Sequence, residues 1–194
     1  AICLIIHDTL SALHFLHSSN IIHRDIKAAN ILLSNAGEVK LADFGVSAVL
    51  RNPNERRNTF TGTPYWMSPE LINSKDFNIT YDNKIDSWAL GITCLELAEM
   101  ETPLQEIAPM KALSEIPNRP SPQLADPSKW SPEFADFVAK CLIKNPEERW
   151  STAQLVKHPF MQGCTHKRSL LADLIERTME AVLAYQQEHE FVDE

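Results

Sequence analysis

An almost uniformly apolar segment near the middle of the chain constrains the fold more than any other feature. Residues 88–92 read Trp-Ala-Leu-Gly-Ile, and Asp86 precedes them. A helix without a polar face must be covered on all sides by other elements, so it lies in the middle of a domain. The sequence therefore predicts a domain built around a central helix that contains these residues.

Three further helices are predicted from apolar spacing and capping residues. Apolar residues recur every three or four positions over residues 2–17, which predicts a helix with one buried face. Ser131 is suited to the N-cap of a second helix that has Pro132 in its first position. Ser151 and Gln154 form a capping box for a third, short helix. These patterns predict a mainly α fold.

One small β-hairpin and one long loop complete the prediction. The β-type runs 31–33 and 39–41 flank the segment Ser34-Asn35-Ala36-Gly37, whose small polar residues and glycine suit a turn. Residues 46–67 follow neither a helical nor a strand period. We expect this stretch to be a long surface loop, and such loops in compact domains are usually functional or disordered.

Composition excludes several classes of protein. The chain has 18 Lys and Arg against 26 Asp and Glu, a net charge of −8, which argues against nucleic acid or an anionic membrane as partner. The apolar run around residues 88–97 is interrupted by Glu96 and is too short to span a bilayer. The cysteines form no C-x-x-C pair, so we expect no zinc site and four reduced, buried thiols in a cytoplasmic protein. They are Cys3, Cys94, Cys141 and Cys164.

Two short motifs point to a specific chemistry. Residues 23–30 read His-Arg-Asp-Ile-Lys-Ala-Ala-Asn, and Asp43-Phe44-Gly45 follows the predicted hairpin. These match the catalytic-loop and metal-binding motifs of protein kinases. Eight specified positions at roughly 5% usage each would coincide by chance about once in 10^10 placements. On these motifs the chain resembles a eukaryotic protein kinase, whose C-terminal lobe is helical with a hairpin at this point.

The resemblance implies a role for each residue of the two motifs. Asp25 would orient the substrate hydroxyl and accept its proton, and Lys27 would stand against the transferring phosphate. Asn30 and Asp43 would bind Mg²⁺ through oxygen atoms. Leu32 would lie beneath the adenine ring, so ATP and Mg²⁺ are the implied cofactors. The alternative is that Asp25 and Asn30 only cap turns beside a hairpin.

Downstream residues of the same family pattern occur in the same order. The segment Gly62-Thr63-Pro64-Tyr65-Trp66 resembles the loop that receives the substrate, and Thr63 would there hydrogen-bond Asp25 and Lys27. Lys27 and Thr63 are features of Ser/Thr rather than Tyr kinases. Proteins with Ser or Thr acceptors are therefore the implied substrates.

Three residues have structural roles by the resemblance. Glu70, in Ser68-Pro69-Glu70, would form an ion pair with Arg149 that holds the end of the loop on the helical body. Asp86 would begin the central helix and support the catalytic loop. Without the family pattern, Asp86 could equally be an ordinary helix cap.

A regulatory phosphorylation site is predicted at Thr59. This residue follows Arg56 and Arg57 in the long loop, and Arg24 precedes the proposed catalytic aspartate. An arginine at position 24 can hold a phosphothreonine and order the loop. The alternative is an exposed and inert threonine.

The last residues form a separate helical segment. The motifs resemble the sterile-twenty-like kinases, and residues 169–176 resemble the segment after the kinase domain in the Hippo subgroup. We assign residues 1–160 to the kinase lobe and 161–194 to an amphipathic helical tail. An amphipathic helix needs a surface to cover, so residues 170–185 are candidates to bind a partner kinase or scaffold.

Elements of the kinase N-terminal lobe do not occur in this sequence. It contains no G-x-G-x-x-G, no Lys before Lys27 and no Glu before Glu38, so the resemblance covers the C-terminal lobe and the N-terminal β-lobe is absent. Two interpretations remain: part of an active Ser/Thr kinase, or an inactive lobe that serves as a protein-binding module. In either case we expect apolar groups such as Leu32 to be exposed and the chain to self-associate or to be poorly soluble.

Overall fold

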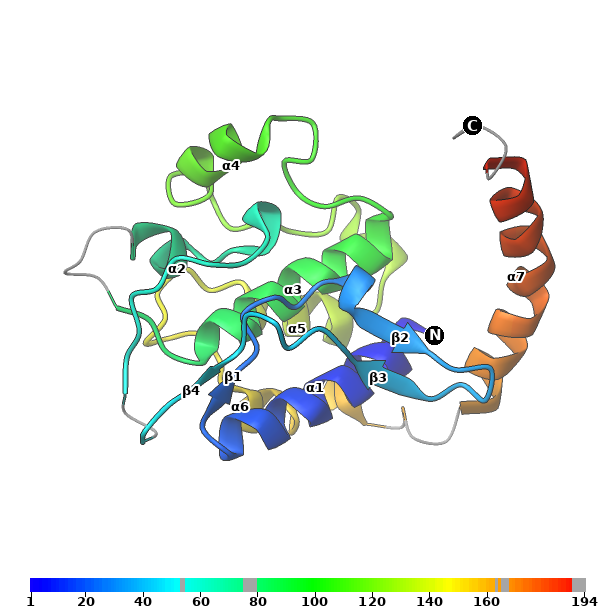
Figure 1. Ribbon diagram of the computed structural model, residues 1–194, viewed down its shortest axis with the longest axis horizontal. Coiled ribbons are helices and arrows are strands. Elements are labelled where there is room, and N and C mark those ends of the chain that lie inside the picture. Colours follow the sequence, from blue (N-terminus) through cyan, green and yellow to red (C-terminus); the bar gives the residue numbers. More distant parts are fainter. Residues whose placement is uncertain (53–54, 75–79, 163, 165–167, 190–194) are drawn as a thin grey trace.

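The computed structural model describes residues 1–194 except 53–54, 75–79, 163, 165–167 and 190–194 (Figure 1). The α-helices are α1 (Ile2–Ser18), α2 (Pro69–Asn73), α3 (Lys84–Glu99), α4 (Pro109–Glu115), α5 (Pro132–Cys141), α6 (Thr152–Leu155) and α7 (Arg168–His189). The strands are β1 (Ile21–Ile22), β2 (Ile31–Leu33), β3 (Val39–Leu41) and β4 (Ala48–Val49). Four short 3-10 helices are η1 (Ala28–Asn30), η2 (Pro64–Trp66), η3 (Pro127–Lys129) and η4 (Pro159–Met161). The mainly α fold is confirmed.

Helix α3 is the central helix that the sequence predicts. Every residue from Ile85 to Leu95 is buried, and the main core cluster joins α3 to α1 and α5. Gly91 lets α3 and α5 approach closely, because a β-carbon at this position would lie 2.7 Å from that of Cys141. Any larger residue would push the two helices apart. The core therefore surrounds α3, and loops and short strands lie around it (Figure 1).

The predicted helix caps are present. The Ser131 hydroxyl accepts a hydrogen bond from the backbone N–H of Phe134 at the start of α5. Gln154 Oε1 accepts from the backbone N–H of Ser151 at 2.9 Å, as part of the predicted capping box at α6. Each cap satisfies N–H groups that the first turn of a helix leaves without intrahelical partners.

The two small sheets are both antiparallel. β2 pairs with β3 in the predicted hairpin, with Ile31 opposite Leu41. β1 pairs with β4, with Ile21 opposite Val49. The prediction that 46–67 lacks regular structure is therefore wrong at β4 and η2. A two-residue strand is too short to show a period, and its pairing partner lies far away in the sequence.

The cysteines also differ from the expectation. Cys3 and Cys164 form a disulfide, with their Cα atoms 5.8 Å apart and 161 positions between them. Cys94 and Cys141 are free and buried. The prediction of four reduced thiols is wrong for the first pair, because only the fold brings together two cysteines so distant in sequence.

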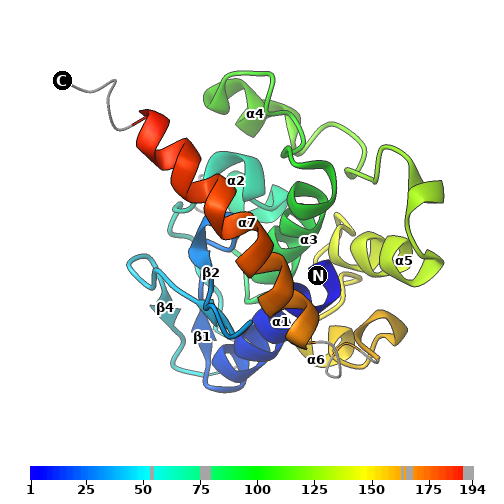
Figure 2. The same ribbon diagram turned by 90° about the vertical axis from the view of Figure 1, so that its right-hand side faces the viewer.

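Helix α7 is anchored to the body by its first turns. Leu171 is buried in a cluster with Leu4, Ile5 and Ile31, and beyond this contact α7 extends away from the other helices (Figures 1 and 2). The helical tail predicted for 161–194 thus spans Arg168–His189, and residues 163, 165–167 and 190–194 of it lie outside the described part. No helix in that part is long and apolar enough to cross a membrane.

Candidate active site

Asp86 holds the backbone of the loop that carries the proposed catalytic residues. Its Oδ2 accepts a hydrogen bond from the His23 backbone N–H and its Oδ1 accepts one from that of Arg24, both at 2.8 Å. The side chain is fully buried and also bonds His17 Nε2 at 2.8 Å. Arg24 has a φ of +72°, a conformation that non-glycine residues rarely adopt. Asp86 therefore stabilises a strained turn immediately before Asp25.

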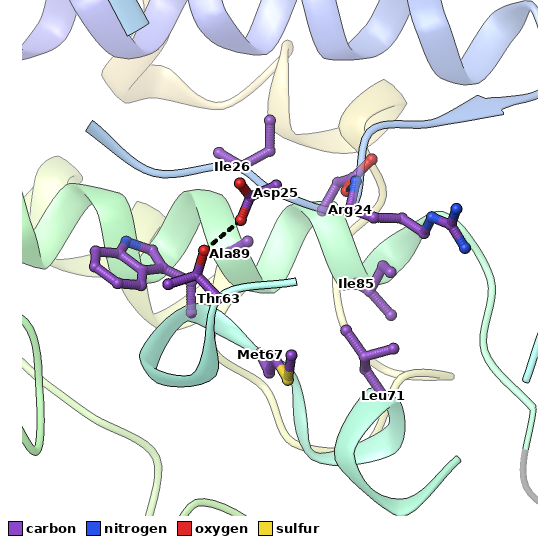
Figure 3. A pocket seen from close by; sticks show the side chains of 10 residues that line it. Arg24, Asp25, Ile26, Thr63, Met67, Leu71, Ile85 and Ala89 are labelled. Carbon is purple, nitrogen blue, oxygen red and sulfur yellow. Dashed lines mark hydrogen bonds between the residues drawn. The ribbon is translucent and has the colours of Figure 1, made fainter. Parts of the chain in front are cut away.

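Asp25 belongs to a cluster of polar side chains, and Figure 3 shows its contact with Thr63. Thr63 Oγ1 donates to Asp25 Oδ1 at 2.6 Å, and Lys27 Nζ lies 2.9 Å from Asp25 Oδ2. Lys27 also donates to Thr63 Oγ1 at 2.9 Å. Burial raises the pKa of Asp25, but the hydrogen bonds from Thr63 and Lys27 and the Lys27 charge outweigh it and hold the pKa below its ordinary value. The carboxylate is therefore ionised at neutral pH.

Asn30 and Asp43 lie on the two sides of the hairpin. Asn30 Nδ2 donates to Asp25 Oδ2 at 3.0 Å and to the Asp25 carbonyl at 2.8 Å, so its amide oxygen is left as a ligand atom. The Ala42 N–H donates to the Asn30 carbonyl at 2.9 Å, which brings the residue before Asp43 beside Asn30. Asp43 itself is exposed and has a φ of +61°.

The donor set suits Mg²⁺ bound together with a phosphate ligand. Asn30 and Asp43 offer hard oxygen atoms, and Mg²⁺ commonly takes one or two protein oxygens and completes its shell with phosphate and water. Among the described residues no three His, Cys, Asp or Glu side chains are grouped so as to hold a metal without such a ligand. The residues present fit Mg²⁺ carried by a nucleotide.

Exposed apolar side chains lie near this cluster. Leu32 is 54% exposed, and Leu33 and Phe44 are also exposed. The Phe44 ring packs edge-on against His23 with centroids 4.9 Å apart, so the side chain is held although it faces solvent. The predicted exposure of Leu32 is confirmed.

Comparison with known proteins agrees with this geometry. A sequence model of the protein kinase domain matches residues 1–161. The chain belongs to the protein kinase family. It is 49% identical over 174 residues to the serine/threonine-protein kinase dst2 and 53% identical over 162 residues to pakH, both from Dictyostelium discoideum, covering 90% and 84% of this chain. It is 49% identical over 177 residues, 91% of this chain, to the hippo kinase of Drosophila melanogaster.

These relatives confirm the predicted likeness to the sterile-twenty-like kinases and their Hippo subgroup. The chain spans only part of each relative: 15% of dst2, 31% of pakH and 26% of hippo. The part matched by the kinase-domain model, residues 1–161, includes both motifs.

The kinase lobe contains the ion pair expected between Glu70 and Arg149. Arg149 Nη2 donates to Glu70 Oε2 at 2.9 Å, and the arginine side chain is fully buried. Arg149 also donates to the carbonyls of Ile143, Lys84 and Lys144. These bonds connect the end of the substrate loop to α3 and to the segment before α6.

Thr59 and Arg24 lie on either side of Tyr81. The Tyr81 hydroxyl donates to the Thr59 carbonyl at 2.8 Å, and Arg24 Nη1 donates to the same hydroxyl at 3.3 Å. Thr59 is exposed, so its own hydroxyl is accessible to another kinase. The structure thus brings the predicted phosphosite near the predicted phosphate-binding arginine.

Sequence reasoning missed Glu96 as a residue of this site. Glu96 Oε2 accepts from the Ala28 backbone N–H and from Trp66 Nε1, both at 3.0 Å. The carboxylate therefore joins the catalytic loop to the substrate loop through α3. The signal in the sequence is that Glu96 is a carboxylate at the end of an apolar helix, which by itself argues only against a membrane span.

Proposed function

We propose that this lobe performs the catalytic part of ATP-dependent phosphorylation of Ser and Thr residues in proteins. The observation that supports it best is the single hydrogen-bonded cluster that joins Asp25 to Lys27, Thr63 and Asn30. Two loop segments contribute to the cluster, residues 25–30 and Thr63, and the contacts that join them link residues too distant in sequence to cap a turn. This argues against a structural role for Asp25 and Asn30.

Asp25 is suited to act on the acceptor hydroxyl. Its pKa is held low, so it is ionised and can orient the hydroxyl and receive its proton as the phosphate is transferred. Lys27 lies beside it and carries the positive charge that a transferring phosphate requires. Thr63 holds both side chains from the substrate loop, and the likeness to serine/threonine-protein kinases supports Ser and Thr as acceptors.

ATP and Mg²⁺ are the cofactors of the proposal. Asn30 and Asp43 would hold the metal, which neutralises phosphate charge in reactions of this class. Leu32 would cover one face of the adenine ring. Since ATP and protein substrates occur together in the cytoplasm, we propose that location for the chain.

Two further roles belong to this proposal. Thr59 would be the regulatory phosphosite, with Arg24 as one ligand of its phosphate. The segment 170–185 of α7 would bind a partner kinase or a scaffold, since Leu174, Val182 and Leu183 are exposed apolar residues on it.

The deciding experiment is a phosphate-transfer assay on the natural full-length product that contains these residues. Asp25→Asn should lower kcat by about 10²- to 10⁴-fold while Mg²⁺-dependent nucleotide binding persists. Asp43→Asn should weaken that binding, measured by calorimetry with and without Mg²⁺. Asp173→Asn, at an exposed position on α7, is the matched control and should change neither quantity. No phosphate transfer by the wild type would favour the alternative of a binding module, and equal, measurable transfer by wild type and Asp25→Asn would contradict the role given to Asp25.

A further inference from the structure

We propose that Cys3 and Cys164 form a reversible thiol–disulfide switch that sets how firmly α7 docks onto the β2–β3 hairpin. The hairpin lies between Asn30 and Asp43, so the switch acts on the segment that positions both proposed metal ligands. The inference does not depend on whether the chain transfers phosphate.

The start of α7 packs directly against the turn of this hairpin. A β-carbon at Gly37 would lie 2.8 Å from the carbonyl oxygen of Arg168 and 3.1 Å from the amide nitrogen of Ala172. Gly37 also has a φ of +74°, which glycine adopts without strain. The turn and the helix therefore approach as closely as a residue without a side chain allows.

Side-chain contacts tie the same helical turns to α1. Leu171 is 1% exposed and packs in one cluster with Cys164, with Leu4 of α1 and with Ile31 of β2. Arg168 Nη2 lies 3.0 Å from Asp8 Oδ2. The disulfide is thus the covalent part of a contact in which α1, β2 and α7 meet (Figure 2).

Cys3 differs from the other three cysteines in its access to solvent, because Cys164, Cys94 and Cys141 are all buried. Cys3 is only half-buried and lines an open groove of about 400 Å³ together with Trp130, Phe134 and Phe160. A small thiol or disulfide can therefore reach its sulfur. Burial raises the pKa of Cys94 and of Cys141 well above the ordinary thiol value, so these thiols stay protonated and unreactive.

The chemical step is an exchange with a low-molecular-weight disulfide such as oxidised glutathione. The Cys3 thiolate attacks one glutathione sulfur, and one glutathione leaves as a thiol after taking a proton. The Cys164 thiolate then attacks the Cys3 sulfur of the mixed disulfide and releases the second glutathione. Two protein thiols are oxidised and one glutathione disulfide is reduced to two thiols. An excess of reduced glutathione reverses the step, as is typical of disulfides with a sensing role inside cells.

The test uses the purified chain equilibrated with oxidised or with reduced glutathione. Each sample is quenched with acid and unfolded in denaturant before a maleimide label is added, so that every free thiol can react. Peptide mapping should then find Cys94 and Cys141 labelled in both samples, and Cys3 and Cys164 labelled only in the reduced one. Hydrogen exchange of residues 31–41 and 168–175 should be at least about tenfold faster after reduction, with residues 132–141 of α5 as the internal control. The Tm should fall by about 5 to 10 °C.

Two variants separate the switch from general loosening of the fold. Cys164→Ser should show the fast exchange of the reduced form in both buffers, while Cys94→Ala should keep the redox response. If Cys164→Ser does not fold, the comparison of the two wild-type samples remains a complete test. Four labelled cysteines in oxidised glutathione, or equal exchange of 31–41 and 168–175 in both samples, would overturn the proposal.

Discussion

The hydroxyl of Thr63 donates a hydrogen bond of 2.6 Å to the carboxylate of Asp25, across 38 positions of sequence. The same hydroxyl accepts a hydrogen bond from Lys27, so one threonine fixes both side chains that act on the acceptor group in the proposed reaction. The substrate loop thereby takes part in holding the catalytic loop. Contacts of this kind can be tested one at a time.

Thr63→Val removes the hydroxyl but keeps the shape of the side chain. The pKa of Asp25 should rise toward or above its ordinary value of 3.8, because burial still favours the protonated form and one opposing hydrogen bond is lost. A pH titration of the labelled carboxyl carbon by NMR measures this shift. Thr63→Ser is the matched control and should keep the low pKa. An unchanged titration in Thr63→Val would contradict the role given to the hydroxyl.

The same pKa predicts how acid affects stability. Asp25 has a lower pKa in the folded chain than in the unfolded one, so the folded state binds fewer protons in the interval between the two values. Its contribution to stability is present above about pH 3.8 and is lost as the pH falls through the folded value. In Thr63→Val this interval should shrink, and the free energy of unfolding should depend less on pH below pH 4.

Asp86→Ala should lower the free energy of unfolding by about 3 kcal/mol, because it leaves the buried N–H groups of His23 and Arg24 without their acceptor. The strained turn at Arg24 should then relax. Urea denaturation measures the loss, and hydrogen exchange at residues 22–25 should become faster. Asp126→Ala, at a partly exposed cap, should cost no more than about 1 kcal/mol. Similar losses of unfolding free energy in both variants would show that the buried hydrogen bonds of Asp86 stabilise the chain no more than an ordinary helix cap does.

The ion pair between Glu70 and Arg149 should show strong coupling. Arg149→Met should destabilise the chain by about 4 kcal/mol, since it leaves a buried carboxylate and three backbone carbonyls without partners. Glu70→Gln should cost less, because Arg149 keeps its carbonyl acceptors. The double variant Glu70→Leu with Arg149→Met should be less destabilised than the sum of its two single variants, measured by urea denaturation in a double-mutant cycle. Additive losses would contradict a direct interaction.

Phosphate at Thr59 should order the loop around it. A chain that carries phosphothreonine at position 59 should show slower hydrogen exchange over residues 57–62 than the unmodified chain. The reason is that Arg24 and the Thr59 carbonyl both hydrogen-bond the Tyr81 hydroxyl, so the Arg24 charge lies near the phosphate. Arg24→Gln should abolish the protection, while Arg51→Gln, an exposed arginine, should retain it. Equal exchange with and without phosphate would mean that Thr59 is not a switch.

The exposed apolar side chains should cause the purified chain to self-associate. Leu32→Glu should lower the fraction of oligomer seen by analytical ultracentrifugation, because it replaces a 54% exposed apolar side chain with a charged one. Met110→Glu, at an exposed position on α4, is the matched control and should leave association unchanged. If both variants associate alike, a different surface is responsible.

Features that depend on neighbouring residues could be predicted from the sequence. The central helix, the caps at Ser131 and Ser151 and the hairpin of β2 and β3 follow from local spacing and residue type, and all are present. The two kinase motifs likewise lie within 23 positions of one another. Local patterns of this kind are set by backbone preferences that act over a few residues.

Features that join distant segments were decided only by the tertiary structure. Four such features have no periodic signal in the sequence, because each depends on two segments that the folded core brings together. They are the β1–β4 pairing, the link through Glu96, the disulfide and the docking of α7 on Gly37. Their energy comes from burial and geometry that exist only after α1, α3 and α5 have packed. The sequence alone identified the residues proposed to carry the chemistry, and the packing of the helices decided which of those residues meet.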